Sequence, residues 1–291
     1  MSTIKLLALI VAMVVSLPAF AQTDFSGEWT RVQDEDSSLN PDLGDWVGLP
    51  LNAAALRRAE TWDASQWTLP EWQCRPHGGA YFKREPAALT ITKEIDPVTR
   101  DITAFNAEWL RQVRVPIYLD GRPHPSKYAP HNWLGFSTAV WEGDMLKITT
   151  THLKESYLRR NGIPVSDKAK LTEYWIRNGD YLTWITITED PVYLTEPFIW
   201  SSNYRLNLQQ QVPPYPCTVV TEIVRPRGVV PHVLPGANDM IKQFTDRNKL
   251  PADAIWAGAE TMYPEFRKKI KDRYVRPDKC SRNCGDPRPG R

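Results

Sequence analysis

The stretch that decides the fold is "GFSTAVWEGDMLKITTTH", residues 135–152. Apolar and polar residues alternate on both sides of Gly143-Asp144, which predicts two half-buried β-strands over 136–142 and 145–155. A glycine at the first central position of a two-residue loop supplies the positive φ of a type II′ turn. The sequence therefore predicts a tight hairpin in which Glu142 faces Met145 and, at the far end, Gly135 faces His152.

One face of this hairpin changes in character along its length. Trp141 and Leu146 lie near the turn, whereas Ser137, Thr150 and His152 lie at the far end. Such a gradient is expected of a barrel wall whose filled floor opens into a cavity. We therefore expect His152 at the mouth of a cavity.

A second hairpin is predicted at Asn178-Gly179, a type I′ signal. Its partners would be Trp175 with Leu182 and Glu173 with Trp184. If this face points inward, the buried Glu173 carboxylate becomes a candidate acid or base; if it points outward, Glu173 is an ordinary exposed residue. The opposite face is also fit for burial, so both orientations stay open.

Alternation and β-branched content predict many further strands. Short turns join several of them, which requires antiparallel pairing, so we expect a mainly β chain with an antiparallel up-and-down, lipocalin- or calycin-like barrel. A β-sandwich is the alternative. The expected strands start at 25 and span 89–95, 102–110, 112–119, 170–177, 181–188 and 198–206, and helices are expected over 52–61, 238–248, 252–259 and 264–274.

The first residues have the layout of a cleavable signal peptide: Lys5, an apolar run over 6–17, Pro18 and then Ala-Phe-Ala. We expect residues 1–21 to be removed and the protein to be periplasmic or secreted. No later apolar run approaches the ~20 residues that a membrane helix needs. The expected domains are a barrel over 22–235, with an insertion at about 33–86, and a C-terminal helical extension with a tail over 236–291.

Without Lys5, the 36 basic residues become 35, against 34 acidic ones. This balance gives no electrostatic reason to expect nucleic acid or an anionic membrane as partner. Four cysteines in an exported protein are typical of disulfides, and the favoured pairs are Cys74 with Cys217 and Cys280 with Cys284. A zinc site at Cys280 and Cys284 lacks a second ligand pair at suitable spacing.

The candidate catalytic residues are His152 with Glu173 or Asp120, as acid and base. His124 and His131 are expected at the rim of the cavity. Their spacing matches no standard ligand pattern, so we expect no metal, and we expect no cofactor. The residues expected to line the ligand cavity are Ser137, Thr150, His152, Trp175 and Trp184.

Several motifs carry a resemblance. Gly27-Glu28-Trp29 is similar to the Gly-x-Trp opening of lipocalin-type barrels. The runs 118–125, 133–135, 141–144, 74–76, 190–193 and 258–264 together resemble a large group of exported bacterial proteins of uncharacterised function. The resemblance implies export and a lipocalin-like barrel, and it implies no reaction or catalytic residues. The segment after the first strand and the C-terminal helices depart from a lipocalin.

Three functions follow as hypotheses. The first is a barrel that binds a small hydrophobic or aromatic molecule in its cavity, because apolar pockets with a few polar groups are common in such barrels. The alternative is an enzyme, a hydrolase, isomerase or lyase, that uses a cavity histidine with a carboxylate. The third is an interaction role for the C-terminal helices and the basic tail.

Overall fold

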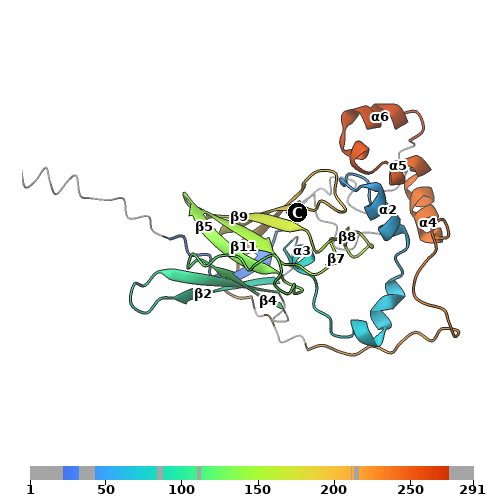
Figure 1. Cartoon of the computed structure of the whole chain (residues 1–291). Coiled ribbons are helices and arrows are strands. Elements are labelled where there is room, and N and C mark those ends of the chain that lie inside the picture. The colour runs from blue at the N-terminus through green and yellow to red at the C-terminus, as the bar shows by residue number, and fades with distance from the viewer. Residues whose placement is uncertain are drawn as a thin grey trace, which may run out of the picture.

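A computed structural model describes residues 22–32, 43–83, 88–109, 113–210, 212 and 216–274 of the chain. The predicted signal peptide, 1–21, and the predicted Cys280–Cys284 pair lie outside the described residues. A β-barrel stands on one side of the molecule, and helices gather beyond one of its ends (Figure 1). Among the described residues, no helix is long and apolar enough to cross a membrane.

Nine strands close the barrel in the order β1-β11-β10-β9-β6-β5-β4-β3-β2. Neighbours in the chain are neighbours in the sheet, except that the short pair β7 and β8 stands outside it. The strands are β1 Gly27–Arg31, β2 Ala88–Ile95, β3 Ile102–Trp109, β4 Val113–Tyr118, β5 Phe136–Glu142, β6 Met145–Thr151, β7 Ser156–Tyr157, β8 Pro164–Val165, β9 Lys170–Asn178, β10 Tyr181–Glu189 and β11 Phe198–Leu206.

One strand pair corrects the expected all-antiparallel barrel. The strands β4 and β5 run parallel, with Ile117 paired to Ser137 and Tyr118 to Thr138. A parallel pair cannot be joined by a tight turn, so it needs a longer connection. Residues 119–135 supply it, and their backbone is tied back to the chain after β6 by a bridge between Asn132 and Leu153. The barrel is therefore closed and mixed.

The predicted register of the β5–β6 hairpin is confirmed from Phe136 with Thr151 to Glu142 with Met145. The predicted register of the second hairpin is wrong by two residues, because Asn178 pairs with Tyr181 and the turn is Gly179-Asp180. Side chains alternate with a period of two, so this shift changes the partners but not the faces. Trp175, for example, faces Trp184 and not Leu182.

The insertion after β1 builds short helices that lie across one end of the barrel. They are α2 Ala53–Glu60, the 3₁₀ turns η1 Ala64–Thr68 and η2 Pro70–Trp72, and α3 Gly79–Phe82. Asn52 caps α2 by accepting a hydrogen bond from Ala55 N. The glycine at 79 lets α3 approach the barrel closely, since a Cβ there would lie 2.6 Å from Leu134 O. The last turn of α3 thereby reaches the barrel interior.

The C-terminal helices pack on the insertion. They are α4 Asp239–Asn248, α5 Ala252–Trp256, the 3₁₀ turn η3 Gly258–Met262 and α6 Pro264–Ile270. Ile241 and Phe244 of α4 and Ile255 of α5 join Leu56 of α2 in one apolar cluster. The barrel interior forms a second cluster, and Phe25 packs into it against Trp141, Phe105 and Trp175 with ring centroids 5.6 to 6.0 Å apart.

Candidate functional site

The barrel interior contains a buried lysine side chain, which comes from the insertion. Lys83, directly after α3, points its ammonium into the barrel, where Nζ donates to Glu173 Oε1 at 2.6 Å, Thr150 Oγ1 at 2.6 Å and Ser137 Oγ at 3.1 Å. These three acceptors match the three donors of an ammonium group. Burial lowers the pKa of Lys83, and the contact with the Glu173 carboxylate opposes that shift.

Glu173 points inward, which answers the question that the sequence left open. Its Oε2 accepts a hydrogen bond from Trp184 Nε1 at 3.0 Å, while Oε1 serves Lys83 and Thr150. Both side chains of the Lys83–Glu173 ion pair are 0% exposed. The Lys83 ammonium has three acceptors, and both carboxylate oxygens of Glu173 accept hydrogen bonds. The pair is therefore a structural element that joins the insertion to the barrel wall.

Four of the residues expected to line a ligand cavity thus lie in a sealed interior. Ser137, Thr150, Trp175 and Trp184 are at most 1% exposed. Ser137 and Thr150 contact the Lys83 ammonium, and Trp175 packs on Trp184 with ring centroids 5.1 Å apart. The chain's own lysine occupies the polar end of the barrel that the sequence assigned to a ligand.

His152 does not lie at the mouth of a barrel cavity, as the predicted hairpin register implies. The strand ends at Thr151, and His152 adopts a left-handed backbone conformation with a φ of 59°, so strand alternation no longer sets its direction. Its Nδ1 bonds to Thr151 Oγ1 at 2.7 Å and its Nε2 to the carbonyl of Ser126 at 2.9 Å. His152 therefore contacts the 119–135 connection and not Glu173.

The other three polar candidates also belong to the 119–135 connection. His124 bonds to the hydroxyls of Thr138 and Thr151 at 2.8 and 2.9 Å, on the face of the β5–β6 hairpin opposite to Ser137 and Thr150. The His131 ring lies 5.2 Å from that of His152. Asp120 forms an ion pair with Arg122 at 2.5 Å. The three histidines attach the connection to the outer barrel wall.

A cavity lies outside the barrel interior, between the barrel end and the insertion. Its volume is about 290 Å³. We call it the mouth cavity. It is lined by the α2–η2 part of the insertion, by residues around β7 and by a segment near His232, and its aromatic lining consists of Trp62, Trp67, Trp72, Trp133 and Tyr157.

Three of these side chains, Trp62, Trp72 and Tyr157, pack edge to face on Trp67. The Trp67 ring is central, with centroids 5.9 Å from Trp62, 5.3 Å from Trp72 and 5.2 Å from Tyr157. Edge-to-face contacts at such distances add stability beyond the area that they bury. The four tryptophans are only partly buried, in contrast to Trp175 and Trp184 inside the barrel. A preformed aromatic wall therefore faces the cavity.

Arg75 adds a cation to this wall. Its guanidinium carbon lies 3.9 Å from the ring centroid of Trp72 and 4.8 Å from that of Trp133. Both distances are within the range of a cation–π contact. The carboxylates of the lining have other partners: Asp63 accepts from Ser65 N at 2.8 Å, and Glu155 lies 3.8 Å from Arg58.

Behind the wall, His77 bonds through Nδ1 to the Tyr157 hydroxyl at 2.6 Å. Its ring stacks on Trp109, with centroids 5.2 Å apart. Burial lowers the pKa of His77 to about 4, aided by the nearby Arg160, and burial raises the pKa of Tyr157. Both groups are therefore neutral at neutral pH, and His77 adds no charge to the cavity.

This neutral histidine predicts a pH dependence of stability. Because the pKa of His77 falls from 6.5 to about 4 on folding, protons bind more tightly to the unfolded chain. The free energy of unfolding should therefore decrease as the pH falls from 6.5 to 4, by on the order of 3 kcal/mol from this group alone. Urea unfolding of the wild type and of His77→Gln should give a difference that shrinks over this window. A difference that stays constant would show that His77 does not titrate as described.

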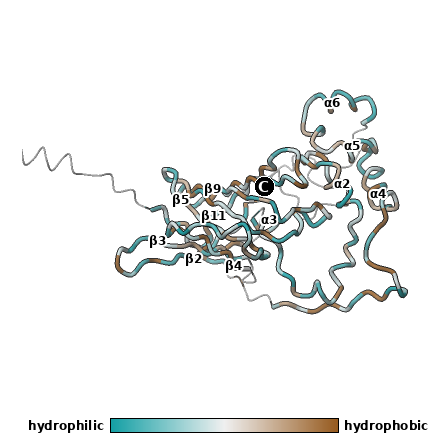
Figure 2. Tube along the Cα trace, viewed as in Figure 1, coloured by the Kyte–Doolittle hydropathy of each residue, from teal (hydrophilic) through white to brown (hydrophobic). Residues whose placement is uncertain are grey.

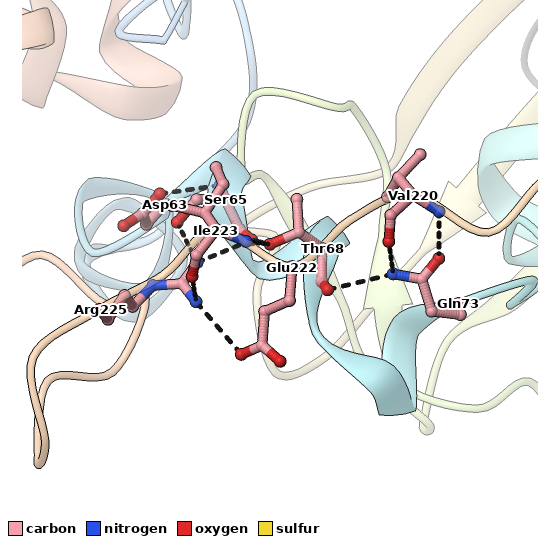
Figure 3. A network of polar contacts seen from close by, with 8 residues as sticks. All are labelled: Asp63, Ser65, Thr68, Gln73, Val220, Glu222, Ile223 and Arg225. Carbon is pink, nitrogen blue, oxygen red and sulfur yellow. Dashed lines mark hydrogen bonds and ion pairs between the residues drawn. The ribbon is translucent and has the colours of Figure 1, made fainter.

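A disulfide and an extended segment hold the insertion over the barrel end. Cys74 is bonded to Cys217, as predicted. From there residues 216–237, which we call the strap, run antiparallel to η2 and η1. Val220 exchanges two hydrogen bonds with the Gln73 side chain, Ile223 N donates to Thr68 Oγ1, and Arg225 donates to Ser65 (Figure 3).

The strap also reaches the mouth cavity, because Pro231 and His232 line it. Val233 N donates to Thr61 O at 3.1 Å and so fixes this part of the strap against the end of α2. A hydrophobic stretch precedes α4 (Figure 2), although Val229, Val230 and Leu234 are exposed. The disulfide and the strap together determine one wall of the cavity.

Sequence reasoning missed both Lys83 and the mouth cavity. Trp62, Trp67 and Trp72 recur every five residues in a segment without helix or strand periodicity, and Arg75 follows the disulfide cysteine. This concentration of tryptophan in a predicted loop was the available signal. No family model, curated protein or solved structure matches the chain. Within the described ranges, no three histidine, cysteine or acidic residues are grouped as a metal site would require.

Proposed function

We propose that the protein binds a small hydrophobic or aromatic molecule in the mouth cavity. The observation that carries the proposal is the wall of four partly exposed tryptophans around about 290 Å³ of space. Ligand sites are concave and mainly apolar, with few polar groups, and range from about 300 to 1,000 Å³. The volume is at the low end of this range, so it suits a molecule of one or two rings.

The tryptophans themselves support this assignment. A large aromatic side chain gains most by full burial, as Trp29, Trp46, Trp175 and Trp184 show at 0 to 1% exposed. Trp62, Trp67, Trp72 and Trp133 leave part of their surface open beside a hollow. Apolar surface gathered in a concavity indicates a binding site more than a defect of packing.

The proposal includes export to the periplasm or the medium, as the N-terminal sequence predicts. The disulfide between Cys74 and Cys217 supports it, because such bonds persist in oxidising compartments. We also propose that the protein, like a lipocalin, binds its ligand with the help of a β-barrel. The ligand would lie at the barrel end and not inside the barrel, so that the barrel acts as a rigid support and the insertion supplies the aromatic wall. The acid–base alternative gains no support, since both His152 nitrogens bond to groups other than carboxylates.

The test is a calorimetric titration with 2-naphthol, a neutral two-ring probe. We expect binding to the wild type and an affinity loss of about tenfold or more in Trp67→Leu, because the central ring of the wall is removed. Trp141→Leu is the matched control, since this partly buried tryptophan packs on Phe25 away from the cavity. No binding to the wild type, or equal losses in both variants, would contradict the proposal.

A further inference from the structure

We propose that the ligand of the mouth cavity is an aromatic carboxylate whose anionic group is received by Arg75. This inference rests on the proposed function and specifies its ligand class. It is carried by the placement of one guanidinium: Arg75 lines the cavity, lies over two indole rings and forms no ion pair within 4.0 Å with a carboxylate of the described chain.

Most of the N–H donors of the Arg75 guanidinium have no hydrogen-bond acceptor among the described residues. The guanidinium lies over the rings of Trp72 and Trp133, and one terminal nitrogen donates to the carbonyl of Glu71 at 3.0 Å. A guanidinium has five N–H donors in its plane. The remaining donors are suited to a planar carboxylate, which accepts two parallel hydrogen bonds from one guanidinium. The stacking also fixes the guanidinium before a ligand arrives.

Two other arginines, by contrast, have a direct carboxylate partner. Arg122 also lies over an aromatic ring, that of Tyr118 at 3.7 Å, but it is paired with Asp120 at 2.5 Å. Arg273 is likewise paired with Asp253 at 2.8 Å. Over the described residues, no carboxylate oxygen lies within 4.0 Å of the Arg75 guanidinium. The Glu71 carboxylate attracts Arg75 electrostatically from a greater distance, so a bound carboxylate would be the first direct ionic partner of this guanidinium among the described residues.

The surroundings favour an anion. Lys154 Nζ lies 5.2 Å from the Trp133 centroid, and the Arg160 guanidinium lies 5.8 Å from that of Trp67. The acidic residues of the lining are engaged, Asp63 by the backbone of η1 and Glu155 by Arg58. Partial burial beside apolar rings also strengthens an ionic contact relative to one in open water. The aromatic part of the ligand would lie on Trp62 and Trp67.

The experiment compares 2-naphthoate with 2-naphthamide, which has the same rings and nearly the same shape but no charge. By calorimetry at pH 7, we expect 2-naphthoate to bind the wild type about tenfold or more tightly than 2-naphthamide. Arg75→Gln should lower the affinity for 2-naphthoate by a similar factor and leave that for 2-naphthamide within about twofold. Arg122→Gln, the stacked arginine outside the cavity, should change neither.

The outcomes separate the two proposals. If the wild type binds the two probes with equal affinity and Arg75→Gln changes neither affinity, the carboxylate inference is overturned, while the aromatic site stands. If neither probe nor 2-naphthol binds, the proposed function fails and the inference fails with it. Circular dichroism and thermal unfolding check that Arg75→Gln folds. If Arg75→Gln does not fold, Arg75→Lys replaces it, and the comparison of 2-naphthoate with 2-naphthamide on the wild type becomes decisive. The wild type must bind the carboxylate more tightly than the amide.

Discussion

Glu173→Gln should lower the free energy of unfolding by roughly 3 to 5 kcal/mol, the loss expected when one partner of a buried ion pair is removed. The amide can still accept from Trp184 or Thr150, but it leaves the Lys83 ammonium without a counter-charge at a position that is 0% exposed. Urea unfolding at pH 7, followed by far-ultraviolet circular dichroism, measures the loss.

The matched control is Glu142→Gln. Glu142 forms an ion pair with Lys147 at 2.7 Å across the β5–β6 hairpin, but both side chains are at least one-third exposed. Exposed pairs contribute about 0 to 1 kcal/mol, so this variant should be nearly as stable as the wild type. Lys83→Met combined with Glu173→Leu should regain much of the loss, because no buried charge remains. Equal stabilities of Glu173→Gln and Glu142→Gln would contradict the buried pair.

Cys74→Ser with Cys217→Ser should lower the free energy of unfolding by about 5 kcal/mol in the chain-entropy account. The large value follows from the 143-residue separation of the two cysteines. The same variant should weaken ligand binding, because the strap and Arg75 lose their common anchor beside the mouth cavity. Urea unfolding and the 2-naphthol titration measure the two effects.

Reduction of the wild type should reproduce the loss of stability, and reductant should have little further effect on the double variant, in which only the predicted Cys280–Cys284 pair could still be reduced. Cys280→Ser with Cys284→Ser is the control, since a bond between cysteines four positions apart closes a far shorter loop and stabilises less. A double variant at 74 and 217 as stable as the wild type would show that the strap is held by its hydrogen bonds alone.

The strands were predictable because their signal is local. Alternation located β5 and β11 to the residue and the other long strands to within a few residues. The Gly143-Asp144 turn fixed the β5–β6 register. At 178–180 the sequence Asn-Gly-Asp offers two overlapping turn signals, and the chain uses Gly-Asp in both hairpins. Choosing Asn178-Gly179 therefore shifted the pairs by two and kept each face correct.

The parallel β4–β5 pair and the position of His152 were not predictable in this way. Whether β4 and β5 run parallel depends on the path of residues 119–135, which has no periodicity to read. His152 follows the last strand residue and has a positive φ, a conformation that alternation does not describe. Because the backbone leaves the strand conformation between Thr151 and His152, the His152 side chain lies at the outer wall of the barrel and not in its interior.

The interior network was half predicted. Strand parity places Ser137 with Thr150 on one face and Glu173 with Trp184 on another, and it leaves the direction of the second face open; the structure brings the four together inside the barrel. Lys83, the partner of Ser137, Thr150 and Glu173, lies 54 to 90 positions away along the chain, directly after a four-residue helix in a segment whose sequence predicts a loop. Long-range contacts of this kind leave no local pattern, so the same parity was read as a ligand cavity.

The most direct test of the account is a crystal structure of the protein grown with 2-naphthoate. We expect density for the naphthyl ring against Trp62 and Trp67, a carboxylate within hydrogen-bond distance of Arg75, and Lys83 still bonded to Glu173 inside the barrel. Density for the ligand inside the barrel, with the Lys83 ammonium displaced from Ser137 and Thr150, would contradict it.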